Sequence, residues 1–240
     1  MQPLDASTRV LDNNPCADQA LVVRGEFRDG RASSFSYTCN RCLHCCYSKR
    51  IQLNPYEVAR LARSLGETTR EFREKWTIDG AGIEVLRTQS GACVFLGPDG
   101  CTVHSDRPLV CRLYPLGRKL GPDGTEEFVR LTAHPESTGI YETNGTITEF
   151  LESQAVASFI KAADDYYELF CRLHSQLADG AENGFSETAD ATTLEARELL
   201  DIDTAVKLFC ERAGSREPSD IEERKNIHLK VLYAILSNQR

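Results

Sequence analysis

The chain has 240 residues, and its hydrophobic fraction of 41% is enough for a globular core. The net charge is −8, from 36 acidic and 28 basic residues, which argues against a nucleic-acid-binding surface because such a surface is basic. No apolar run approaches the roughly 20 residues of a membrane-spanning helix, and the N-terminus lacks the apolar stretch of a signal peptide. We therefore expect a cytoplasmic protein with no nucleic-acid and no membrane partner.

The first expected elements are a short strand at Leu21–Val23 and a loop at Cys39–Cys46. A helix follows, with Asn54 as N-cap, Pro55 at its first position and Gly66 as its stop.

A capping box at Thr68 opens a second short helix that runs to Trp76. The sequence Gly-Pro-Asp-Gly at positions 97–100 is typical of a hairpin turn. Short strands are expected at Val85–Thr88, Val94–Leu96, Thr102–Val103 and Phe128–Leu131.

The last third of the chain is expected to be helical. A capping box begins at Thr146, and apolar residues at helical spacing predict one continuous helix through 150–173. A polar loop at 180–193 separates it from two more helices, near 194–212 and 220–237.

The predicted fold is α+β and predominantly helical. An irregular Cys-rich metal-binding core with short strands would be packed by a C-terminal helical region. The expected division is an N-terminal segment over 1–34, a Cys-rich metal-binding domain over 35–143 and the helical region over 144–240.

Ten cysteines are present, and seven of them fall between Cys39 and Cys111. In a reducing compartment they are unlike a disulfide framework, and metal binding or redox chemistry is the better interpretation.

Four of these cysteines have the spacing CxxCxxCC. Thiolates two residues apart in a tight loop can turn inward around one centre, and a run of three begins the cluster sites of bacterial ferredoxins. Cys46 departs from that pattern because it follows Cys45 directly, and neighbouring side chains of an extended chain point in opposite directions. We therefore expect Cys45 and Cys46 to serve different metals, or one of them to bridge two.

The other three cysteines are brought near one another by the predicted turns. The hairpin places Cys93 close to Cys101, and the rigid Arg107-Pro108 turn directs the chain back toward Cys111. Seven thiols are too many for one tetrahedral centre. They suit a cluster plus another metal, two metals, or a polynuclear site.

The CxxCxxCC loop, together with Cys101–Pro115 (CTVHSDRPLVCRLYP), resembles the cysteine-cluster family that carries the CxxCxxCC signature. This family is also called the YkgJ type or the zinc- or iron-chelating domain. The resemblance covers a little under half of the chain and implies metal binding by the cysteines. Members are often labelled iron–sulfur oxidoreductases, a label that rests largely on the cysteines.

Two departures from the family pattern involve histidines. His104 stands where the family often has Tyr, and His134-Pro135 stands where members often carry a late Cys-Pro. If the second correspondence holds, His134 supplies an imidazole in place of a thiolate; otherwise it is a surface histidine. His44, inside the cysteine loop, is interpreted as an exposed loop residue. The candidate ligands are Cys39, Cys42, Cys45, Cys46, Cys93, Cys101, Cys111 and His134.

Two arginines accompany the second signature. Arg107 and Arg112 would either lie at the surface or offset thiolate charge and donate hydrogen bonds to sulfur or to a nearby carboxylate.

The expected function is a cysteine-cluster metalloprotein that binds an iron–sulfur cluster or iron, with redox or oxidoreductase activity carried by the cofactor. One alternative is a zinc protein whose metal is structural and whose C-terminal helices bind a protein partner. Another is a metal delivery or assembly factor. No Ser–His–Asp arrangement, paired-carboxylate signature or phosphate loop is present, so no catalytic residue is assigned.

Overall fold

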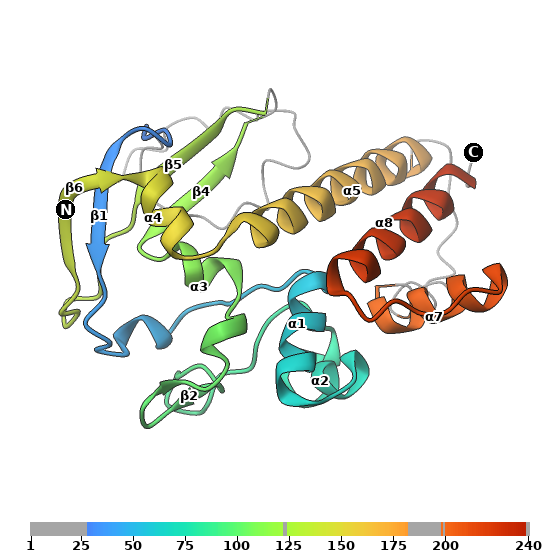
Figure 1. Cartoon of the computed structure of the whole chain (residues 1–240), viewed down its shortest axis with the longest axis horizontal. Coiled ribbons are helices and arrows are strands. Elements are labelled where there is room, and N and C mark those ends of the chain that lie inside the picture. Colours follow the sequence, from blue (N-terminus) through green and yellow to red (C-terminus); the bar gives the residue numbers. More distant parts are fainter. Residues whose placement is uncertain (1–27, 122–123, 182–197, 199, 239–240) are drawn as a thin grey trace, which may run out of the picture.

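The structure is a computed structural model, and it describes residues 28–121, 124–181, 198 and 200–238. Helices are combined with short antiparallel strands (Figure 1). The helices are α1 (Pro55–Leu65), α2 (Thr69–Trp76), α3 (Leu109–Leu113), α4 (Ile147–Ser153), α5 (Ala157–Ala181), α7 (Ile202–Ala213) and α8 (Ile221–Asn238). The strands are β1 (Ser34–Thr38), β2 (Leu96–Gly97), β3 (Gly100–Cys101), β4 (Leu116–Leu120), β5 (Glu126–Arg130) and β6 (Ile140–Thr146). Short 3₁₀ helices lie at η2 (His44–Cys46), η3 (Ile78–Gly80) and η4 (His104–Asp106).

The first two helices begin and end as predicted. The Asn54 side chain accepts a hydrogen bond from the Glu57 amide at 3.0 Å, and the Glu57 carboxylate accepts one from the Asn54 amide at 2.9 Å. Gly66 closes α1 in the left-handed region, at a φ of 71°, where a side chain would be strained. Thr68 caps α2 in the same reciprocal way.

The predicted strands have mixed outcomes. The hairpin is confirmed, but β2 and β3 have only two residues each: the strand expected at Val94–Leu96 is present only at Leu96, and the one expected at Thr102–Val103 is wrong because β3 ends at Cys101. The strand expected at Phe128–Leu131 is confirmed as β5. The strand expected at Val85–Thr88 is wrong. Its residues make single bridges to different neighbours, Val85 to Thr77 and Arg87 to Cys93, so no ladder forms. The strand expected at Leu21–Val23 lies outside the described residues.

Two further strand pairings were not predicted, and one of them joins segments that are remote in sequence. β1 pairs antiparallel with β6, about a hundred residues later, with Tyr37 opposite Tyr141. Figure 1 shows this pair at one end of the molecule, beside α4. The unforeseen β4 forms a hairpin with β5. The β1–β6 pair therefore fixes both the start and the end of the part of the chain that carries the seven candidate cysteine ligands.

The prediction of one continuous helix through 150–173 is wrong, because the segment forms two helices, α4 and α5, with a break between them. α4 ends at Ser153 with Gln154 as its C-cap, Ala155 adopts a φ of 49°, and α5 begins at Ala157. Arg107 donates to the Gln154 side chain at 2.7 Å, and Arg112 donates to the Gln154 carbonyl at 2.8 Å. These contacts come from a distant part of the sequence and stabilise the bend.

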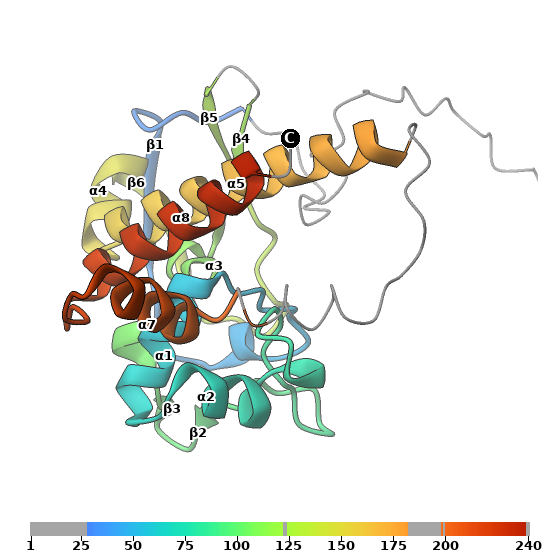
Figure 2. The same ribbon diagram turned by 90° about the vertical axis from the view of Figure 1, so that its right-hand side faces the viewer.

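The C-terminal helices form a layer against α1. α5 and α8 lie side by side, and α7 packs on both α8 and α1 (Figures 1 and 2). The Asp201 side chain caps α7 by accepting from the Thr204 amide at 2.9 Å. The part of the predicted helix near 194–197 and most of the predicted loop at 180–193 lie outside the described residues. No helix in the described ranges combines the length and apolar character that a membrane crossing requires.

In the described residues the buried core is mainly aliphatic and aromatic, and it does not show the predicted Cys-rich core. The cluster nearest the cysteines is built from side chains such as Leu61, Phe72 and Phe95, and Cys93 is its one buried candidate ligand among the described residues. Cys46, Cys101 and Cys111 pack against its edge. A second cluster contains Phe35, Leu113, Leu116, Phe128, Ile147, Phe150, Leu151, Val156 and Ile160. Core packing therefore crosses position 143/144, while the predicted boundary there stays a prediction.

Candidate metal centre

The CxxCxxCC segment leaves β1 and turns sharply instead of running extended. Arg41 and Leu43 both adopt positive φ, at 53° and 66°, and His44–Cys46 form the 3₁₀ helix η2. In this turn the Sγ atoms of Cys45 and Cys46 lie 4.0 Å apart. The expectation that these neighbours point in opposite directions is therefore wrong, because the extended backbone on which it depended is absent.

The hairpin and α3 bring the later cysteines to the same place. The Cys93 amide donates to the Cys46 carbonyl at 2.8 Å, which joins the hairpin to the cysteine loop. Cys101 lies on β3 and Cys111 on α3. The thiols influence one another: the hydrogen bond with Cys45, burial, and the charges of Cys111 and Cys101 raise the pKa of Cys46. Burial, followed by neighbouring thiols, likewise raises the pKa of Cys93 and Cys111.

Cys39 and Cys42 lie at the other end of the loop, next to residues 131–139, which we call the strap. Asn40 Nδ2 donates to the Thr138 carbonyl at 2.6 Å, and the Cys42 thiol lies 3.9 Å from the Ser137 hydroxyl. The Thr138 amide, with help from His44, lowers the pKa of Cys42 to about 6. Cys39 is exposed.

Two histidines meet where the loop and the strap touch. The rings of His44 and His134 are stacked, with centroids 5.1 Å apart and planes within 10° of parallel. His44 Nε2 lies 3.2 Å from a Glu136 carboxylate oxygen, whereas His44 Nδ1 is buried and has no hydrogen-bond partner among the described residues. The structure thus places His134 beside the cysteine loop. His44 is half-buried, not exposed as expected.

A lysine that the sequence interpretation missed lies among the thiols. Lys49 Nζ is 3.4 Å from the centroid of the Tyr114 ring. Burial lowers the pKa of Lys49, while the charges of Cys45, Cys111 and Cys46 act to raise it. The hydrogen bond from Cys46, followed by the charge of Lys49, lowers the pKa of Cys45 to about 6. A lysine three residues after a CC pair is a weak signal, because the position alone does not reveal the cation–π contact.

The two arginines have structural roles in the contacts that the structure gives. Arg112 is buried, donates to the carbonyls of Ser105, Arg107 and Gln154, and lies 4.1 Å from the centroid of the Phe159 ring. Arg107 donates to the carbonyl of His104. His104 itself is exposed and lies far in sequence from His44. The expected hydrogen bonds from these arginines to sulfur are not among those found in the described residues. Burial raises the pKa of Cys101, but the charge of Arg107 acts to lower it, as expected of an arginine that offsets thiolate charge.

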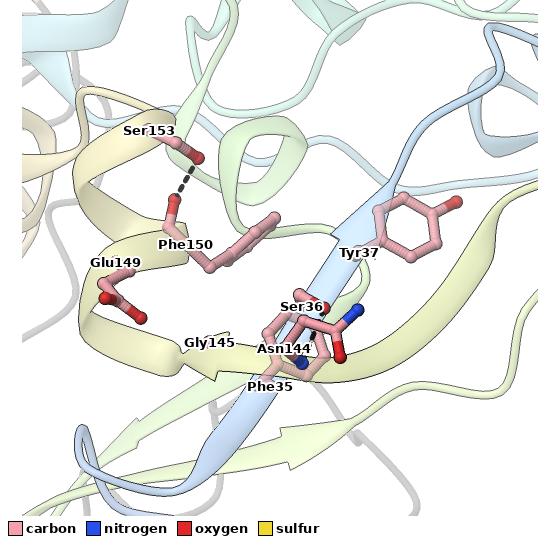
Figure 3. Close-up of a pocket in the computed structure, with 8 residues that line it drawn as sticks. All are labelled: Phe35, Ser36, Tyr37, Asn144, Gly145, Glu149, Phe150 and Ser153. Carbon is pink, nitrogen blue, oxygen red and sulfur yellow. Dashed lines mark hydrogen bonds between the residues drawn. The ribbon is translucent and has the colours of Figure 1, made fainter.

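Two cavities of the described residues have no cysteine in their walls. One of about 300 Å³ is lined by residues of β1, β6 and α4, including Tyr37, Asn144 and Phe150 (Figure 3). The other, of about 630 Å³, lies where α4 meets α5. Across the described residues, no group of three or more His, Cys, Asp or Glu side chains is arranged so that it could hold a metal ion.

The comparisons with known proteins give one match. Residues 38–134 match the family model CxxCxxCC, described as a putative zinc- or iron-chelating domain. No curated protein and no solved structure matches the chain. The match covers both cysteine signatures and His134, and it supports metal binding by this part of the chain.

Proposed function

Because residues 38–134 match the model of a putative zinc- or iron-chelating domain, we propose that this chain binds iron, as an iron–sulfur cluster or as iron ions. Bound iron would supply one-electron redox chemistry. The proposed ligands are Cys39, Cys42, Cys45, Cys46, Cys93, Cys101 and Cys111, and His134 stays a predicted eighth ligand.

The observation that carries the proposal is the separation of the Cys45 and Cys46 sulfurs. Two sulfurs that each lie about 2.3 Å from one tetrahedral ion are roughly 3.8 Å apart, and here the distance is 4.0 Å. This spacing supports a shared ion, or a bridging sulfur, over two independent centres. The remaining thiols flank the pair on both sides, so more than one metal is compatible with the donor set.

The protonation of the thiols also suits a cation. Burial raises the pKa of Cys93, Cys101 and Cys111, so these thiols stay protonated at neutral pH in the metal-free protein. A metal would replace those protons and compensate the charge of the thiolates. Lys49 adds a positive charge to the same cluster.

Zinc is the second candidate, and the same sulfur spacing favours it, because tetrahedral sulfur sites are typical of both zinc and iron–sulfur proteins. Zinc would supply folding free energy, and the C-terminal helices would present a surface to a protein partner. Metal delivery is the third candidate, for which the exposed Cys39 thiol is the relevant feature.

The test is metal analysis and visible absorbance of protein purified without oxygen, with Cys39→Ser, Cys46→Ser and Cys111→Ser variants. Cys210→Ala is the matched control, since Cys210 is buried on α7, outside the proposed ligand set. We expect coloured, iron-containing protein that loses metal in the three serine variants and keeps it in the control. A colourless zinc protein would favour the second candidate, and intact metal content in all three serine variants would overturn the proposal.

A further inference from the structure

The position of His44 within the cysteine loop points to a nitrogen ligand. His44 begins η2, between Cys42 and Cys45, and its ring influences the Cys42 thiol. One of its two nitrogens, Nδ1, is shielded from solvent and meets no donor or acceptor of the described residues at full hydrogen-bond geometry, while the ring interacts with the Cys42 thiol. Buried polar atoms in folded proteins nearly always have a well-aligned partner, so a buried nitrogen without one, on a ring beside the Cys42 thiol, requires an explanation.

The hydrogen bonding of His44 specifies which nitrogen is free to bind. A carboxylate only accepts, so the His44 nitrogen that faces Glu136, Nε2, carries the proton. In the neutral ring, Nδ1 then has the lone pair. Metal-ligating histidines commonly donate their other nitrogen to a carboxylate in this way.

His134 has the opposite arrangement. Its Nδ1 accepts a hydrogen bond from the Glu136 amide at 3.2 Å, so the lone pair is already engaged and the neutral ring carries its proton on Nε2. Glu136 therefore holds both rings, but it leaves a lone pair available only on His44.

We propose that His44, through Nδ1, is the nitrogen ligand of the metal centre, with Glu136 orienting its ring and His134 supporting it by stacking. This inference rests on the metal-binding function proposed above. It assigns the imidazole ligand to His44 in the CxxCxxCC loop, and not to His134 in the strap as predicted from the sequence.

The experiment compares His44→Ala with His134→Ala, because both variants lose the same ring stacking and only the first loses the Nδ1 lone pair. Metal-free protein is loaded with Zn²⁺ and studied by X-ray absorption spectroscopy and by competition with a chelator. His44→Gln repeats the test with a bulkier side chain, and circular dichroism verifies the fold of each variant. His104→Ala is the matched control for removal of a histidine outside the loop.

In the unmodified chain we expect a Zn–N distance of about 2.0–2.1 Å beside Zn–S distances of about 2.3 Å. His44→Ala and His44→Gln should lose the nitrogen contribution and weaken zinc binding by at least about 100-fold. Glu136→Gln should weaken it roughly tenfold, the lower end of the range for outer partners, because Glu136 is exposed. His134→Ala and His104→Ala should retain the nitrogen.

Three results would overturn the inference. An all-sulfur zinc shell in the unmodified chain would refute it while leaving metal binding intact. Loss of nitrogen in His134→Ala but not in His44→Ala would return the ligand to the strap. Absence of zinc binding in the unmodified chain would overturn it as well, and the iron content of protein purified without oxygen would then show whether the proposed function fails with it.

Discussion

Replacing Arg112 by Met tests whether this arginine connects the Cys111 helix to the C-terminal helices. Its guanidinium donates to three backbone carbonyls and lies on the Phe159 ring. Arg112→Met keeps much of the apolar stem but leaves those carbonyls without their donor. Each lost partner costs about 1 kcal/mol for a partly buried acceptor, and the cation–π contact adds roughly 0.5–1 kcal/mol. We expect the free energy of unfolding to fall by roughly 3–4 kcal/mol, a large part of the stability of a typical domain.

The assay is urea denaturation of the metal-free protein, so that metal affinity does not enter the measured stability. Arg130→Met is the matched control. Arg130 also makes one carboxylate and one carbonyl contact, but its side chain is 41% exposed, so its loss should cost under about 1 kcal/mol. Arg112→Lys should be intermediate, because an ammonium lacks the planar fork. Equal losses in Arg112→Met and Arg130→Met would refute this account.

Three more predictions concern single side chains. Gly139→Ala places a Cβ about 1.9 Å from the Tyr37 hydroxyl, so it should destabilise the protein by roughly 1–3 kcal/mol, whereas Gly30→Ala, which meets nothing within 4 Å, should change the Tm little. Alkylation of Cys42 in the metal-free protein should increase through a pH of about 6, not 9, and mass spectrometry after a brief iodoacetamide pulse would show a midpoint near 9 if the reasoning is wrong. Burial raises the pKa of Glu57 from its ordinary value of 4.5 to about 7. Between these two pH values Glu57 keeps its proton in the folded chain and has lost it in the unfolded chain. Stability relative to Glu57→Gln should therefore fall as pH rises from about 4.5 to 7, and a pH-independent difference in urea midpoints would contradict this.

Local signals were enough for the parts of the fold that depend on neighbours in sequence. Asn54, Gly66 and Thr68 have the predicted capping roles because a cap needs only residues within one turn. The hairpin around positions 97–100 was likewise predictable from its turn residues.

Long-range contacts explain the features of the fold that local sequence patterns did not predict. The bend at Ala155 depends on arginines about 45 positions earlier, and β1 depends on a partner strand about a hundred residues later. In the candidate site, the turns read from the sequence predicted that the later cysteines lie near one another. The different hydrogen bonding of His44 and His134 depends on Glu136, which no local pattern links to His44.

The β1–β6 pairing has a consequence for how this metal-binding unit can be isolated or transplanted. The segment matched by the family model, 38–134, begins at the last residue of β1 and ends before β6. Excised alone, it would keep both cysteine signatures but lose Phe35, Ile147 and Phe150, and with them one wall of the core that surrounds Leu116 and Phe128. The smallest autonomous fragment should therefore begin before Ser34 and extend through α4, which makes the helix after the signature part of the metal-binding unit's own architecture.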